Sequence, residues 1–141
     1  MKIAFTTDDS VHINAHFGWA KKIDIYDVTT EGYKLVENLV FTGDLKEDGN
    51  EDKLNPKLEA LEDCTIVSVS EIGPGAAARL INKRLTPIKA PSETTEIVDV
   101  LDRLVVTLKG SPPPWLRKAL GQKNSTVLEE DYVAVEEEVA V

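Results

Sequence analysis

A chain of 141 residues with 42% hydrophobic and 29% charged residues has the size and composition of one globular domain. Its net charge is −9, and because the last eighteen residues contain six acids and no base, the rest of the chain has only −3. This balance excludes the strongly basic surface that binds nucleic-acid phosphates. Since the sequence shows one cysteine, no secretory pattern and no run of about 18 apolar residues, we expect a cytoplasmic protein without disulfides or a membrane span.

Apolar residues spaced two apart predict strands over 2–7, 22–28 and 33–42. The neighbours Ile25 and Tyr26 break this alternation and predict a β-bulge. Between the second and third strands, Thr30-Glu31-Gly32 is a hairpin-turn signal. The acidic, glycine-containing segment that follows, 43–52, is expected to be an exposed loop.

Helices and strands are predicted to alternate from residue 54 onward. Leu54, Leu58 and Leu61 have helical spacing, and the helix is expected to begin near Asn55 and Pro56. Further strands are predicted over 64–70 and 86–90, and further helices over 73–84 and 94–108. The order β-β-β-α-β-α-β-α predicts an α/β protein with a five-stranded mixed sheet flanked by helices, which is the element order of ribonuclease H-like folds.

Three consecutive prolines follow the last of these helices and predict an extended segment, in which Trp115 and Leu116 supply apolar surface to bury. We therefore divide the chain into a domain, a Pro/Trp segment packed on it and a flexible acidic tail, over residues 1–110, 111–123 and 124–141.

Both histidines lie in one short segment, DDSVHINAHFGWA, directly after the first strand. A neutral imidazole binds iron and other transition metals, although on a loop His12 and His16 need not share a face. The alternative is that both only form hydrogen bonds, since no further histidine can complete a closed zinc site. Phe17 and Trp19 are candidate core anchors, and Gly18 is a candidate for a positive φ angle.

Two other features are candidates for ligand binding. Cys64 begins the fourth predicted strand, where a cysteine is either a small buried hydrophobe or a thiolate ligand for a soft metal. In EIGPGAAARL, Gly73 and Gly75 stand at the start of a helix that contains Arg79, and free N–H groups there favour an anion. Packing of this helix on the sheet explains the same glycines equally well.

Two-metal nuclease chemistry is another activity that a ribonuclease H-like fold suggests, and it needs several acids that converge on Mg²⁺. Asp8 and Asp9 end the first strand and Glu59 lies on the first predicted helix. No further acid pairs convincingly with them, and the sequence shows no basic groove, so this activity is disfavoured.

Three stretches together resemble the NifX-like family of nitrogenase iron–molybdenum cofactor biosynthesis proteins: DDSVHINAHFGWAKKIDIYDV, EDKLNPKLEALEDCTIVSVSEIGPGAAARLINKRLTPIKA and GSPPPWLRKAL. The resemblance covers about residues 1–120. It implies a ribonuclease H-like fold and a non-catalytic carrier that binds an iron–sulfur precursor of the cofactor as transient cargo. It also implies partners among assembly proteins, such as the cluster donor NifB and the NifE–NifN scaffold, and neither nucleic acid nor membrane.

The family's His-Phe-Gly motif matches His16, Phe17 and Gly18, and the resemblance implies that His16 ligates the cluster. We hypothesise that His12 or Cys64 is a second ligand. Several groups are expected to offset the cluster's negative charge, namely Gly73, Gly75, Lys21, Lys22 and Arg79. The competing interpretation is an interaction module that docks on nitrogenase or its assembly proteins through Trp115 and the prolines and binds no cluster.

Overall fold

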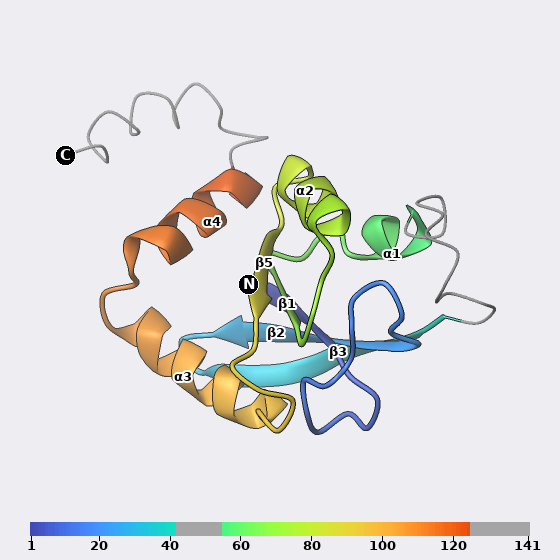
Figure 1. The fold of residues 1–141 in the computed structure, drawn as a ribbon. Coiled ribbons are helices and arrows are strands. Elements are labelled where there is room, and N and C mark those ends of the chain that lie inside the picture. The colour runs from blue at the N-terminus through green and yellow to red at the C-terminus, as the bar shows by residue number, and fades with distance from the viewer. Residues whose placement is uncertain (42–54, 125–141) are drawn as a thin grey trace.

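A five-stranded mixed sheet forms the centre of the computed structural model, which describes residues 1–41 and 55–124 (Figure 1). The strand order is β3–β2–β1–β4–β5, with β1 antiparallel to β2, β2 antiparallel to β3, and both β4 and β5 parallel to β1. The strands are β1 (Lys2–Thr6), β2 (Lys22–Thr29), β3 (Gly32–Val40), β4 (Ile66–Val69) and β5 (Thr86–Lys89). The predicted α/β class and mixed sheet are confirmed.

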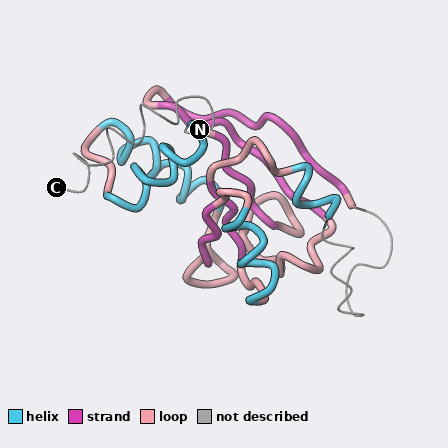
Figure 2. The backbone as a smooth tube through the Cα atoms, turned by 90° about the horizontal axis from the view of Figure 1, so that it is seen from above, coloured by secondary structure: helices cyan, strands magenta, loops and turns pink. Residues whose placement is uncertain are grey.

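Helices cover both faces of this sheet (Figure 2). One face is covered by α1 (Asn55–Ala60) and α2 (Pro74–Asn82), and the other by α3 (Ile97–Lys109) and α4 (Pro114–Asn124). Because successive strand residues point to opposite sides, β1 serves both cores: Ala4 joins the α1/α2 side, and Ile3 and Phe5 join the α3/α4 side.

The connection between β2 and β3 agrees with the sequence. Their register shifts between Ile25 and Tyr26, which confirms the predicted bulge. The hairpin turn then lies between Thr29 and Gly32, and Gly32 has a φ of 151°, a conformation that residues with a side chain rarely adopt.

The Pro/Trp segment differs from the prediction, because α4 begins at Pro114 where an extended chain was expected. A proline fits the first helical position, since its fixed φ is already helical and the missing N–H has no partner there. Leu116 is fully buried on the α3 side of the sheet, whereas Trp115 is 45% exposed. This segment is therefore largely helical, and it packs on the domain through Leu116, Ala119 and Leu120.

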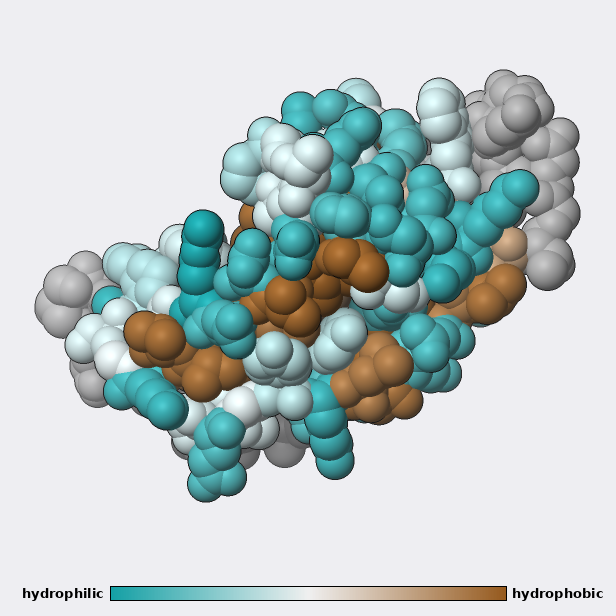
Figure 3. All heavy atoms as spheres, turned by 90° about the horizontal axis from the view of Figure 1, so that it is seen from below, coloured by the Kyte–Doolittle hydropathy of each residue, from teal (hydrophilic) through white to brown (hydrophobic). Residues whose placement is uncertain are grey.

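The edge strand β3 exposes apolar side chains, with Leu35, Val36 and Val40 all more than 40% exposed. Viewed from below, apolar side chains come to the surface in several patches separated by hydrophilic ones (Figure 3). Within residues 1–41 and 55–124, no helix has the length and apolar character that crossing a bilayer requires. The predicted exposed loop 43–52 and most of the predicted acidic tail lie outside the described residues.

Candidate functional site

The histidine loop, residues 7–20, joins β1 to β2 at the carboxyl ends of the parallel strands, where open α/β sheets place their ligands. Backbone hydrogen bonds fix it at two places. Near His12, the Ile13 amide donates to the Thr95 carbonyl at 2.9 Å. Near His16, the Phe17 amide donates to the Glu71 carbonyl at 2.8 Å. The loop is thus tied to the segments that follow β5 and β4.

Burial alternates along the middle of the histidine loop. Ile13, Ala15 and Phe17 are buried, whereas His12 and His16 are partly exposed. Alternate residues of an extended chain point to the same side, so both imidazoles lie on the outer side of the loop. Four extended residues place their Cα atoms about 13 Å apart. The two imidazoles therefore share one side of the loop, which the sequence alone left open.

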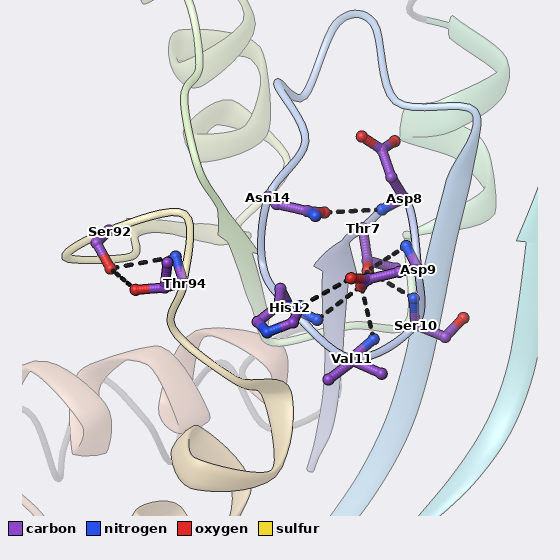
Figure 4. A network of polar contacts seen from close by, with 9 residues as sticks. All are labelled: Thr7, Asp8, Asp9, Ser10, Val11, His12, Asn14, Ser92 and Thr94. Carbon is purple, nitrogen blue, oxygen red and sulfur yellow. Dashed lines mark hydrogen bonds and ion pairs between the residues drawn. The ribbon is translucent and has the colours of Figure 1, made fainter.

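A carboxylate holds the ring of His12 (Figure 4). The Asp9 Oδ1 atom accepts the amides of Val11 and His12 at 2.9 and 2.8 Å, and Oδ2 lies 2.7 Å from His12 Nδ1. The bonds from His12 and Val11 hold the pKa of Asp9 well below its usual range, and the bond to Asp9 raises the pKa of His12. In the neutral ring Nδ1 keeps the proton and Nε2 the lone pair, the arrangement common among metal-ligating histidines.

The ring of His16 is held in the opposite tautomer. The Gly18 amide donates to His16 Nδ1 at 3.0 Å, and the ring stacks on Trp19 with 4.7 Å between centroids. Burial lowers the pKa of His16, which favours the neutral ring. Its single proton therefore sits on Nε2. Unless the ring loses that proton as well, coordination through either nitrogen requires breaking the Gly18 hydrogen bond.

Gly18 and Trp19 have different roles from those predicted. The φ angle of Gly18 is not positive, so backbone strain does not select glycine there. A Cβ at this position would lie 3.4 Å from His16 Cε1, and glycine leaves space beside the ring. Phe17 is fully buried, as expected of a core anchor, but Trp19 is 57% exposed and contacts His16 instead.

Lys57 of α1 is a residue of this site that the sequence analysis missed. It is fully buried beneath the histidine loop, where its Nζ donates to the carbonyls of Phe17 at 2.8 Å and Gly18 at 3.1 Å. Burial lowers the pKa of Lys57 to about 8, so the amine is still mostly charged at pH 7. One signal was present: Lys57 stands four residues before the buried Leu61, on the apolar side of the helix.

Gly73 lies near His16 in the fold although the two are far apart in the sequence. It follows two residues after Glu71, whose backbone pairs with that of His16. A Cβ on Gly73 would meet nothing within 4 Å, so packing does not require glycine there. Gly75 belongs to the first turn of α2, whereas Arg79 belongs to the last turn and is not at the helix N-terminus. Lys21 and Lys22 stand where the histidine loop enters β2.

Cys64 is not brought to the histidines. It is 1% exposed in the α1/α2 core and precedes β4, whereas His16 pairs with Glu71 beyond the other end of that strand. Over the described ranges 1–41 and 55–124, no three His, Cys, Asp or Glu side chains are grouped to hold a metal ion. Of the three predicted ligands, the histidine loop therefore contains His12 and His16 but not Cys64.

Comparisons with known proteins match most of the chain. The family model described as dinitrogenase iron–molybdenum cofactor matches residues 1–106. Protein NifX of Herbaspirillum seropedicae is 46% identical over 133 residues, 93% of this chain and 90% of that protein. The FeMo cofactor biosynthesis protein NifB of Bradyrhizobium diazoefficiens is 33% identical over 87 residues, 61% of this chain and 17% of that protein. The crystal structure of PH0822 has a similar fold, with a TM-score of 0.58 at 19% identity over 75% of this chain and 91% of that one.

Proposed function

This chain belongs to the dinitrogenase iron–molybdenum cofactor family, and on that basis we propose that it carries an iron–sulfur precursor of the cofactor during nitrogen fixation. The observation that supports this proposal is the pair of partly exposed imidazoles on one side of the histidine loop. The chain acts as a carrier that is not itself a catalyst. The similarity to NifX and NifB favours cofactor assembly proteins as partners. The donor in this proposal is NifB, and the scaffold is the NifE–NifN complex.

The two histidines differ in whether a ring nitrogen is free to bind a cluster. His12 already presents a lone pair on Nε2, because Asp9 holds the proton on the other nitrogen. As long as its ring keeps the Nε2 proton, His16 ligates only after its bond from the Gly18 amide is broken, a loss of about 0.5–1.5 kcal/mol. A cost of this size suits a carrier, which must release its cargo as well as bind it. We place both ligands on the loop, since ligation by Cys64 would require opening the core.

The test is to add the isolated cofactor precursor anaerobically and to follow co-elution of iron and the visible spectrum. The unmodified protein is expected to retain the cluster, and His16→Ala and His12→Ala each to retain less. Cys64→Ala is the matched control and is expected to retain as much as the unmodified protein. If His16→Ala and the unmodified protein retain the cluster equally, His16 is not a ligand.

A second function is favoured by one observation: Trp115 is 45% exposed at the first turn of α4, beside the prolines. Large exposed aromatic side chains are frequent anchors of protein interfaces. In this account the chain docks on nitrogenase or its assembly proteins and binds no cluster. It becomes the better account if the unmodified protein retains no iron and Trp115→Ala weakens binding to the NifE–NifN complex.

A further inference from the structure

Lys57 is a buried charge to which the proposed function assigns no role. Its side chain is fully buried, and across residues 1–41 and 55–124 no carboxylate forms an ion pair with it. The ammonium is held by two backbone carbonyls, and it lies 5.7 and 5.5 Å from the ring centroids of Phe17 and Phe41. Removing a cation from water is costly, and the carbonyls and aromatic faces offset part of that cost.

The contact between Lys57 and the loop is connected to His16 through one peptide group. The Phe17 carbonyl, which accepts from Lys57 at 2.8 Å, and the Gly18 amide, which donates to His16 at 3.0 Å, belong to the same planar unit. In a trans peptide these two groups point in opposite directions. A donor that fixes the Phe17 carbonyl on one side therefore aims the Gly18 N–H to the other side, at Nδ1 of His16.

We infer that Lys57 is a positioning residue: through the Phe17–Gly18 peptide it fixes the ring and tautomer of His16, and its ammonium supplies positive charge beneath the loop for an anionic cargo. The first part concerns this chain alone, and the second rests on the proposed function. Of the cations expected from the sequence, Lys21 is exposed, so water screens its charge, whereas the charge of Lys57 acts in a buried, less polar environment.

The first part is tested without cargo, by ¹⁵N NMR of the histidine rings at a pH where His16 is neutral. In the unmodified protein His16 is expected to show a bare Nδ1 and a protonated Nε2. Lys57→Met removes the donor, and the His16 signals are expected to move toward an average of both tautomers. Lys57→Arg keeps the positive charge and the N–H donors, and its His16 ¹⁵N signals are expected to match those of the unmodified protein.

Two controls separate positioning from loss of the fold. Lys21→Met removes an exposed lysine directly after the histidine loop and is expected to leave the ¹⁵N signals of His16 unchanged. His12, which Asp9 holds independently, reports in every variant whether the loop is still folded. If Lys57→Met does not fold, Lys57→Gln decides, because its shorter side chain stays polar but cannot reach both carbonyls. A folded neutral variant that keeps the original His16 signals overturns the positioning role.

The second part is tested by retention of the isolated cofactor precursor. Lys57→Met is expected to weaken retention about tenfold, which corresponds to about 1.4 kcal/mol. Lys57→Arg is expected to stay near the unmodified protein, and so is Lys109→Met, which removes an exposed lysine at the end of α3. Unchanged retention by a folded Lys57→Met protein overturns the role of the charge. If the unmodified protein retains no cluster, the proposed function and this second part fail together, while the NMR result still decides the positioning role.

Discussion

At the scale of single residues, the two histidines show how neighbouring groups assign different chemistry to the same side chain. His12 and His16 lie on the same side of one loop, yet a carboxylate faces Nδ1 of the first and a backbone amide faces Nδ1 of the second. The sequence singled out both residues because they fall in one short polar segment, and the predicted ligand role of His16 came from the match to the family's His-Phe-Gly motif. It did not predict their tautomers, which depend on a local turn at Asp9 and on the Phe17–Gly18 peptide.

The two rings are expected to titrate in a fixed order. Burial lowers the pKa of His16, and the bond to Asp9 raises the pKa of His12, so His16 loses its proton first as the pH rises. Protonated His12 stabilises the folded protein through its bond to Asp9. This contribution is present at low pH and is lost as the pH rises through the pKa of His12 in the folded state. NMR titration of the Cε1–H signals measures both values. Asp9→Asn should lower the pKa of His12, and the reverse order of titration would contradict this geometry.

Lys57 shows where prediction from the sequence stops. A lysine on a predicted amphipathic helix is ordinarily assigned to the exposed side. Only the structure shows that α1 contacts the histidine loop, where Lys57 donates to the carbonyls of Phe17 and Gly18. The partners are about forty residues apart in the chain, and no local pattern connects them. Cys64 is the opposite case, since one of its two predicted roles, a small buried hydrophobe, agrees with its 1% exposure.

At the scale of elements, spacing predicted most helices and strands, and the break at Ile25 and Tyr26 predicted the bulge. The failure at α4 has a simple cause. Three consecutive prolines predict an extended segment, but Pro114 occupies the first turn of the helix, the one turn that tolerates proline. Neighbours in this helix also differ sharply, because Leu116 is buried and Trp115 is half-exposed.

This difference predicts unequal effects of two adjacent truncations. Leu116→Ala leaves a cavity between α4 and the α3 side of the sheet and is expected to lower the free energy of unfolding by about 2–5 kcal/mol. Trp115→Ala removes a side chain that is largely in water, and we expect a loss below about 1 kcal/mol. Urea unfolding followed by circular dichroism compares the two variants. Equal losses would mean that α4 is not anchored as described.

At the scale of the whole molecule, one sheet separates two cores, and β1 contributes to both of them. The layers could be predicted from the alternation of strands and helices. The strand order could not, because the pairing of β1 with β4 joins Ile3 to Ile66 across a long separation in sequence. The histidine loop depends on that order, since its two anchors lie after β4 and after β5.

A shared central strand predicts that the two cores unfold together. Leu80→Ala on the α2 side and Leu101→Ala on the α3 side are each expected to reduce the free energy of unfolding by about 2–5 kcal/mol. In both variants a single urea transition is expected, with amide exchange of β1 accelerated to a similar degree. Two separate transitions in either variant would show that the cores are independent units.

The stacking of His16 on Trp19 gives the loop an optical reporter of its own. Indole emission is quenched by a protonated imidazole in contact with it and by iron nearby, and the Trp19 ring lies 4.7 Å from the ring of His16. Replacing Trp115, the second tryptophan of the chain, with phenylalanine leaves Trp19 as the sole indole. The light emitted by such a protein would test in real time whether the proposed cluster arrives at His16 and leaves it, without a label attached to the loop.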